Sequence, residues 1–513
     1  MNANWLALAL SALFLCVYFT GAIISSLTLG PEGKTRRSFN LGLPITSKPG
    51  ELFAISLVSA ATSLSTVFVA FLTAPATWGL HLLICPVTFA AGTLLSIHTY
   101  RRILRHGYLD EPDGSGLLPR FAYVFTGSRA VAVLVALASV LPIAAILVLE
   151  LHFGVHLFDD LLKDATGQRV GLATYATFLI LLLGYVFVGG FRAVVTSDVW
   201  QYRTLKVGIG IAFAGWLAAA LYRPTPWTGL RDFAGSASQS SLVAFYVTVS
   251  VINLFVPMCL ATSWQRFYAF RTEPIDYREA GLSAVWKLTT LWVGIIGVGL
   301  LAGSLSPPPD SNTTAADAFF AVLRGIKGGP GVGLAEWFKY FVFPLLIAAA
   351  FSGMYSSSDT CVSALLYLVE AREHPNRGAS RPLGRSYYVI MASIFLFCIV
   401  TYELTFKVGD LVTYATAIFG NATLIAPTVL LISFREPGRV VSLAKRRKLC
   451  IVTSIIAGFV VHWSLFSFHS QGGVSFTPWR PWAAPLGLIA AAAPVVLLLW
   501  IEWRTERKDG ADV

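Results

Sequence analysis

The 513-residue chain is 56% hydrophobic and only 13% charged, and its formal net charge is +11. Soluble globular domains carry about 25% charged residues, so this composition excludes a soluble globule and predicts a membrane protein with many spans. The positive charge requires no nucleic acid as a partner, because the inner loops of membrane proteins collect Lys and Arg next to anionic lipid head groups. The bilayer itself is the partner that this composition indicates.

Runs of about 18 or more mostly apolar residues predict thirteen transmembrane helices, a count that could be wrong by one. No Lys or Arg precedes the first run and no cleavage site follows it, so we expect a retained helix there rather than a signal peptide. The predicted spans are 5–27, 51–72, 80–99, 128–150, 171–189, 203–221, 242–262, 287–305, 338–369, 387–404, 411–433, 450–468 and 482–503.

The Lys and Arg residues are unevenly divided between alternate loops. Most of the 38 basic residues fall in the loops that begin at 28, 100, 190, 263, 370 and 434 and in the tail 504–513. The positive-inside rule then places the N-terminus outside and the C-terminus inside, with 504–513 as a short cytoplasmic tail. We expect residues 1–503 to form one transmembrane domain in the plasma membrane, which is the inner membrane in a bacterium.

Ten of the predicted helices divide into two blocks of five, residues 51–221 and 242–433. Because five is odd, the second block enters the membrane from the opposite side, which is typical of an inverted repeat. The helix 5–27 is then an extra N-terminal one, and 450–503 holds two C-terminal helices. In such repeats the first helix of each half is usually broken at the midplane. Hydroxyl residues between Ser56 and Thr66, and Asn253 with Pro257, predict these two breaks.

One carboxylate, Asp359, lies in the otherwise uncharged run Phe341–Val369. A charge at this depth costs several kcal/mol unless it faces a partner, an ion or water, so it predicts a functional site. Hydroxyl residues surround it. In helices, Ser and Thr hydroxyls often donate a hydrogen bond to a carbonyl of the preceding turn. This purely structural role is the alternative to a functional site here. Two hydroxyl clusters and the carbonyls of an unwound turn instead suit an alkali cation, since all of these are hard oxygen ligands.

Three stretches resemble signatures of the solute:sodium symporter family. They occur in the family's order and spacing, and the resemblance covers nearly all of residues 1–503. It implies an all-α LeuT-like fold with a five-plus-five inverted repeat, and sodium-driven uptake of a small organic solute by alternating access. The three stretches are Gly189-Gly190-Phe-Arg-Ala-Val-Val-Thr-Ser-Asp198-Val-Trp-Gln201, Gln265-Arg266-Phe267, and Ser356-Ser357-Ser358-Asp359-Thr360.

The resemblance also implies a main sodium site. The backbone carbonyls of Ser59 and Thr62 in the first broken helix would be ligands, joined by the carbonyl of Gly353. The hydroxyl groups of Ser356 and Ser357 would complete the site. The spacing agrees with this, because Gly353, Ser356 and Ser357 share one face of a helix.

A second cation site, found in some family members, would use Asp198, Asp359 and Thr360. Two acids at one point repel strongly in a low dielectric, so either a cation lies between them or one is protonated. A second sodium ion and a proton both remain open. An alternative for Asp198 is an interfacial acid that pairs with Arg192 or Arg203.

The solute pocket of this family varies with the substrate. Its expected first-helix positions here are Ala61, Ser65 and Thr66, none of them charged. A neutral, hydroxyl-lined pocket favours a polar or zwitterionic solute, although helix N-termini could hold an anion. Further candidates are Trp78, Asn253, Tyr414 and Asn421.

The leading prediction is therefore a sodium symporter with no organic cofactor. The alternatives are a proton-coupled symporter and a symporter-like solute sensor that works with a separate signalling partner. No nucleophile–base pair or metal cluster occurs in the predicted bundle, so we do not expect an enzyme.

Overall fold

The computed structural model describes most of the chain, and every regular element in the described part is a helix, as predicted. The described residues are 3–27, 41–44, 46–106, 118–167, 171–221, 235, 237–303, 319, 321–324, 335–373, 385–400, 417–435, 441–467 and 480–509. In chain order the helices that carry the argument are α1 (Ala3–Leu27), α3 (Pro49–Ala61), η2 (Leu64–Val69), α4 (Ala70–Thr73), α5 (Pro75–Trp78), α6 (Ile84–Arg105), α7 (Leu118–Thr126), α8 (Arg129–Thr166), α9 (Gly171–Leu221), α10 (Gln239–Cys259), α11 (Ala261–Ala269), α12 (Tyr277–Gly303), α14 (Ala335–Trp337), η6 (Phe338–Val342), α15 (Phe343–Glu373), α16 (Arg385–Val400), α18 (Ala426–Phe434), α19 (Val441–Ser467) and α20 (Ala483–Asp509).

Ten helices in the described ranges are long and apolar enough to cross a membrane, and the bent pair Pro49–Ala61 and Leu64–Thr73 would be an eleventh. The protein is thus a multi-pass membrane protein. Each predicted span coincides with a helix wherever the structure describes it. The count of thirteen and the orientation stay predictions.

Helix α9 contains two of the predicted spans. A straight helix of its 51 residues would be about 77 Å long, more than twice the hydrocarbon thickness of a bilayer. The backbone is non-helical at Gly190, with φ 56° and ψ −153°. A residue with a Cβ rarely adopts such a positive φ, so glycine allows the chain to turn there. The predicted spans 171–189 and 203–221 lie on the two sides of this turn.

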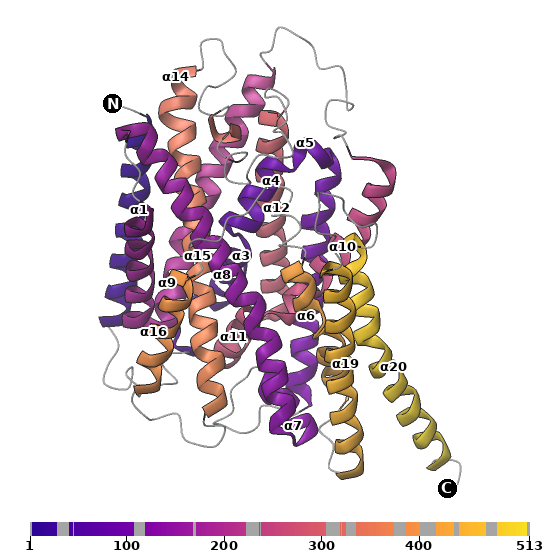
Figure 1. Cartoon of the computed structure of the whole chain (residues 1–513). Helices are drawn as coiled ribbons and strands as arrows, with labels where there is room; N and C mark the ends of the chain where they lie inside the picture. The colour runs from indigo at the N-terminus through magenta and orange to yellow at the C-terminus, as the bar shows by residue number, and fades with distance from the viewer. Residues whose placement is uncertain are drawn as a thin grey trace.

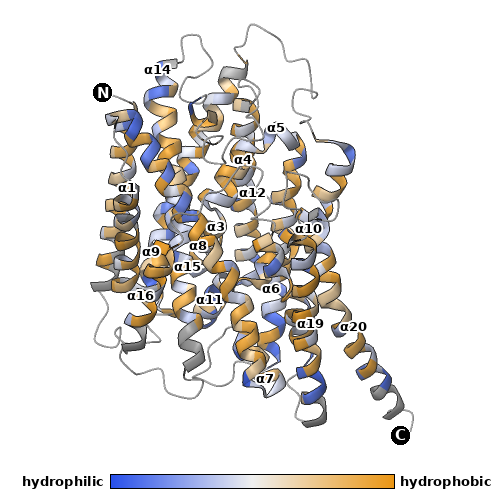
Figure 2. Cartoon of the chain, in the orientation of Figure 1, coloured by the Kyte–Doolittle hydropathy of each residue, from blue (hydrophilic) through white to orange (hydrophobic). Residues whose placement is uncertain are grey.

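Helix α15 lies in the middle of the bundle and packs against α1, α3, α8, η2 and α9. Figure 1 shows α1 at one edge and the paired α19 and α20 at the other, with α8 running obliquely between them. The first turn of α1 and the last turn of α20 lie at opposite ends of the bundle. Hydrophobic residues cover most of the helices, and hydrophilic residues gather at the lower ends of α7, α19 and α20 (Figure 2).

The first predicted break is confirmed. Helix α3 ends at Ala61, and the next two residues have extended backbones, with ψ 91° at Thr62 and ψ 158° at Ser63. The chain then resumes as η2 and α4, bent by 64° from α3. Between the two halves, backbone groups have no helical partners, so this turn can offer them to a ligand.

The second break lies at Leu260, after the predicted positions Asn253 and Pro257. Both of those residues are helical in α10, and Leu260, with ψ 128°, separates α10 from α11. Proline lacks the N–H that would bond to the carbonyl of Asn253, but α10 continues for two more residues, to Cys259. A Cβ on Gly92 of α6 would lie 2.3 Å from that carbonyl oxygen, so the two backbones touch here.

The glycine-rich run of α12 packs tightly against its neighbours. A Cβ at Gly297 would lie 2.4 Å from the ring of Phe213, and one at Gly299 would lie 2.3 Å from the carbonyl oxygen of Phe71. In membranes, small residues stabilise helix pairs by letting the backbones approach closely.

We predict that Gly92→Ala destabilises the bundle by about 1–3 kcal/mol, the usual cost of overpacking, because its Cβ would collide with a backbone carbonyl that cannot move aside. The measurement is the melting temperature (Tm) of the purified protein in detergent. Gly210→Ala is the matched control, since no atom lies within 4 Å of the Cβ that it would add. Equal Tm values for the two variants would contradict the predicted contact.

Candidate functional site

The five residues predicted for a main sodium site lie together where α15 crosses the first broken helix. A Cβ on Gly353 would lie 3.1 Å from the carbonyl oxygen of Thr62, so glycine lets α15 approach the unwound turn. The carbonyl of Ser59 accepts a hydrogen bond of 3.1 Å from the Thr62 N–H. The hydroxyl oxygen of Ser357 lies 2.8 Å from the carbonyl oxygen of Gly353. Several oxygen atoms therefore converge on this turn.

A buried ion pair joins α9 to α11. Asp198 accepts a hydrogen bond of 3.0 Å from Arg266, and both side chains are 0% exposed. Asp198 also accepts from the hydroxyls of Ser56 at 2.5 Å and Ser356 at 3.0 Å. Arg266 in turn donates to the Thr360 hydroxyl at 2.8 Å. This network connects α3, α9, α11 and α15.

The partner of Asp198 is therefore Arg266, rather than Arg192 or Arg203. Arg266 also donates to the Ser56 carbonyl at 3.1 Å and to the Thr262 carbonyl at 3.2 Å. A guanidinium has five N–H donors in a rigid plane, so a single side chain can bridge several helices in this way.

A second buried carboxylate, Glu150 of α8, caps the half of the first helix that follows the break. Its oxygens accept hydrogen bonds from the N–H groups of Leu64 at 2.8 Å and Ser65 at 2.9 Å. The hydroxyls of Ser65 and Ser357 also donate to it, the latter at 2.8 Å. The carboxylate lies at the positive end of the half-helix dipole, where a negative charge is stabilised.

Glu150 is not among the site residues predicted from the sequence, because it is the last residue of the predicted span 128–150 and a charge at the end of a span is typical of a membrane boundary. In the structure α8 continues to Thr166, so Glu150 lies well inside the helix and is 0% exposed. The signal was present in the sequence, since the residues from Leu151 to Phe158 carry no Asp, Glu, Lys or Arg.

Asp359 has hydroxyl partners on α9. It accepts hydrogen bonds from the hydroxyls of Tyr185 and of Ser197, the latter at 3.1 Å. The predicted second-site residues are thus only partly brought together: Arg266 contacts both Asp198 and Thr360, whereas the α9 partners of Asp359 are Tyr185 and Ser197.

A cavity of about 180 Å³ extends from the first break along η2, α4, α5 and α10. Four of the predicted solute-binding residues line it: Ala61, Thr66, Trp78 and Asn253. Ser357 and Thr360 of α15 also reach it, so the cavity adjoins both the candidate sodium site and the Asp198–Arg266 network.

Of the remaining predicted solute-binding residues, Ser65 and Asn421 do not line this cavity. Ser65 turns toward Glu150, donating both its N–H and its hydroxyl. Asn421 accepts a hydrogen bond of 3.1 Å from the Trp463 indole. Tyr414 lies outside the described residues.

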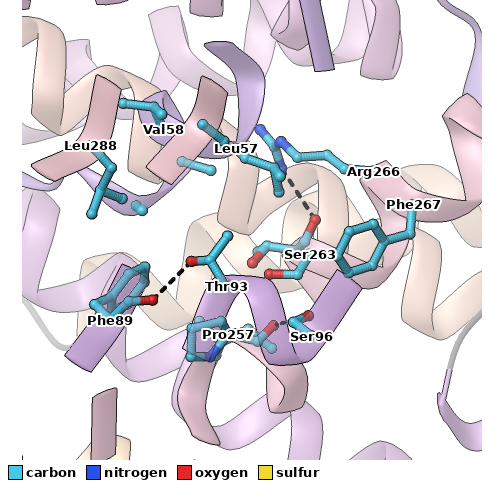
Figure 3. Close-up of a pocket in the computed structure, with 15 residues that line it drawn as sticks. Leu57, Val58, Phe89, Thr93, Ser96, Pro257, Ser263, Arg266, Phe267 and Leu288 are labelled. Atoms are coloured by element: carbon cyan, nitrogen blue, oxygen red, sulfur yellow. Dashed lines mark hydrogen bonds between the residues drawn. The ribbon is translucent and has the colours of Figure 1, made fainter. Parts of the chain in front are cut away.

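A smaller cavity of about 40 Å³ lies beside the large one, lined by residues of α3, α6, α11 and α12. Both cavities are lined by Ala61 and Leu260, so they meet where the two helices break. Figure 3 shows Arg266 reaching over the small cavity, opposite Thr93 and Ser96 of α6. The broken helices therefore separate a larger and a smaller chamber.

Comparisons with known proteins agree on the fold. No family model and no curated protein matches the chain. Among solved structures, a Na⁺-coupled sialic acid symporter, in a substrate-bound outward-open state, aligns with a TM-score of 0.59 and 14% identity over 96% of this chain and 98% of that one.

Two further transporters align with TM-scores of 0.51 and 13% identity. Mhp1, a nucleobase-cation-symport-1 family transporter in a closed conformation, matches over 93% of this chain and 96% of its own. The manganese transporter of Eremococcus coleocola matches over 94% and 98%. The chain therefore has a LeuT-like transporter fold rather than that of an enzyme.

We predict that Arg266→Gln destabilises the protein by about 3–5 kcal/mol, because it leaves Asp198 buried without its positive partner. Adding Asp198→Asn should restore part of the loss, since the double variant buries no lone charge. The measurement is Tm for the two single variants and the double variant.

The control is Arg324→Gln, which breaks the Arg324–Asp160 pair near the surface, where the arginine side chain is 59% exposed. Such pairs contribute about 1 kcal/mol or less. If Arg266→Gln lowers Tm no more than Arg324→Gln does, the buried pair does not hold the helices together.

Proposed function

We propose that the protein is a secondary active symporter of the solute:sodium symporter family, coupling inward sodium movement to uptake of a small organic solute. The observation that carries the proposal is the oxygen cluster at the first break, where Ser59, Thr62, Gly353, Ser356 and Ser357 meet beside a cavity. The likeness to a Na⁺-coupled symporter supports it at the level of the fold. We propose the plasma membrane as its location, with the N-terminus outside.

The hydrogen bonds of the two serines suit a cation. Ser356 donates its hydroxyl proton to Asp198, and Ser357 donates its proton toward Glu150. A hydroxyl that donates its only proton keeps its oxygen lone pairs for a cation. A carboxylate behind the ligand also orients it and raises its basicity. Among the described residues, no cluster of His, Cys, Asp and Glu forms a transition-metal site, and hard oxygens suit sodium.

The two chambers support alternating access. The large one follows η2, α4, α5 and α10, while the small one follows α3 and α11. Elements α3 and η2–α4 are the two halves of the first broken helix, and α10 and α11 are the two halves of the second. Movement of the halves about their breaks would enlarge one chamber as the other closes, so a solute and a sodium ion at the break could face each side in turn.

A second cation at Asp198, Asp359 and Thr360 remains part of the proposal, with one condition. Arg266 contacts both Asp198 and Thr360, so a cation between those two requires Arg266 to move.

Proton coupling at Asp359 is the second candidate. The hydroxyl partners of this carboxylate, Tyr185 and Ser197, allow it to gain and lose a proton, because a hydroxyl can accept a hydrogen bond from a protonated acid and donate one to an ionised acid.

We predict that sodium chloride raises the Tm of the purified protein above its value in potassium chloride. A ligand at about 100 times its Kd stabilises the folded state by about 2.7 kcal/mol. Ser356→Ala and Ser357→Ala should abolish most of the sodium-dependent shift, because each removes a proposed ligand. Equal Tm values of the unsubstituted protein in the two salts would refute the sodium site.

The matched control is Ser352→Ala, one turn earlier on α15. Ser352 is also buried, but its hydroxyl contacts Tyr18 of α1 at 2.7 Å instead of facing the break. This variant should keep the full sodium shift. Screening amino acids, sugars, carboxylates and nucleobases with and without sodium then tests coupling, since a coupled solute stabilises more when sodium is present.

We predict different outcomes of Asp359→Asn for the two coupling ions. Once the screen gives a solute, uptake into proteoliposomes is measured across sodium and pH gradients. Loss of sodium dependence would identify Asp359 as a sodium ligand, whereas loss of pH dependence alone would identify a proton carrier. An unchanged response to both gradients would exclude Asp359 from coupling.

A further inference from the structure

The N-terminal end of the half-helix η2–α4 is already capped by the protein. Glu150 accepts the N–H groups of Leu64 and Ser65 at 2.8 and 2.9 Å, and the Ser63 hydroxyl accepts the Thr66 N–H at 3.1 Å. The backbone donors that could hold the anionic group of a solute are therefore taken. An anion could enter there only by displacing a buried carboxylate of the chain.

The hydrogen bonds of Glu150 indicate that it is ionised. Four donors point at its two oxygens: two backbone N–H groups and the hydroxyls of Ser65 and Ser357. An ionised carboxylate has about four lone-pair positions and no proton to donate, which matches this set of partners. A protonated Glu150 would point its own O–H donor at one of these four donors.

This negative charge lies close behind the wall of the large cavity. Ser357 lines the cavity and is hydrogen-bonded to Glu150 at 2.8 Å. Ile146, one helical turn before Glu150 on α8, also lines it. The field of a buried charge is only weakly screened across such a short, low-dielectric path. A cationic group in the cavity is attracted by it and an anionic group is repelled.

No other charge in the described part of the cavity wall offsets Glu150. None of the described lining residues is charged. The basic side chain nearest to the site, Arg266, is held by Asp198 and lines the small cavity.

The rest of the cavity wall is largely aromatic and apolar, which suits the apolar body of an organic cation. Two of its rings, Trp78 and Phe245, stack with their centroids 4.3 Å apart, and Phe89 and Trp292 are 4.8 Å apart. Aromatic faces attract ammonium groups. The hydroxyls of Thr66 and Ser357 can accept hydrogen bonds from an ammonium. The aromatic lining residues are Phe71, Trp78, Phe89, Phe245, Trp292 and Phe419.

We propose that the solute is a small organic cation, an ammonium group on an apolar body, and that Glu150 sets this preference by filling the anion position and charging the cavity wall. The inference rests on the proposed transport function and narrows its solute class. It differs from the polar or zwitterionic solute expected from sequence, and the aromatic wall with a carboxylate behind it is the reason for the difference.

The test uses the purified full-length protein in sodium chloride and two sets of shape-matched probes. One set is neopentylamine, neopentyl alcohol and pivalate, and the other is benzylamine, benzyl alcohol and benzoate. The dependence of Tm on probe concentration gives an apparent affinity. We expect the amine to bind about tenfold or more tightly than the carboxylate, with the alcohol between them. No stabilisation by either amine, or equal affinity for amine and carboxylate, overturns the proposal.

Glu150→Gln should reduce the amine preference to about threefold or less, and Glu150→Asp should preserve it because the charge remains. Glu336→Gln is the control, since it removes the same charge from an exposed side chain. Ile146→Lys provides a second test should Glu150→Gln not fold, because its added cation should also cancel the preference. A preference that survives in the folded Glu150→Gln or Ile146→Lys variant excludes Glu150 as its source.

The same measurements separate this inference from the sodium proposal. A protein that prefers amines but melts equally in sodium and potassium chloride keeps the solute class and loses sodium coupling. A protein that is stabilised by sodium but shows no preference for amines keeps sodium coupling and loses the proposed solute class.

Discussion

The backbone exposed where the first membrane helix breaks is the constraint on which the rest of the site depends. In a bilayer each unsatisfied backbone group costs several kcal/mol, so a broken helix is stable only if side chains or ligands replace its lost hydrogen bonds. Here Glu150 and Ser63 satisfy the amides that follow the break. The carbonyl of Thr62 at the break lies next to Gly353 on α15. The break thus leaves acceptors available for a cation while its donors are occupied.

Arg266 has the complementary role on the other face of α15. It bonds to Ser56 of α3, Asp198 of α9 and Thr360 of α15, so one side chain joins four helices in the described centre. A buried ion pair gives little net stability compared with apolar packing, but it strongly penalises arrangements that separate its partners. The pair therefore favours this one arrangement of the helix halves, and a transport cycle must weaken it whenever those halves separate.

Much of the fold could be predicted from the sequence, because apolar runs long enough to span a bilayer leave few alternatives. The hydroxyl residues near Thr62 correctly predicted the first break. The second break was harder to place. Pro257 removes one donor, yet α10 continues to Cys259, because tertiary packing against Gly92 offsets the loss of one hydrogen bond.

The charges of the site were less predictable than its helices. Asp359 stood out because its whole span is otherwise uncharged, whereas Glu150 lay at the end of a hydrophobic run and had the pattern of a boundary residue. The partner of Asp198 could not be found by proximity in sequence. Arg266 is 68 positions away and meets Asp198 only because α11 folds back against α3. Contacts of this kind depend on tertiary structure.

Ser357 provides a physical route from the cation to the solute. Its hydroxyl donates toward Glu150 on one side, and its oxygen is a proposed sodium ligand on the other, while its side chain also lines the large cavity. A cation at this oxygen would strengthen the bond to Glu150, because a polarised hydroxyl is a better donor. That bond holds the capped half-helix η2–α4 in place along the cavity wall. Linkage then requires the reverse as well: a solute that favours the same position of η2–α4 must raise the affinity for the cation by the same factor.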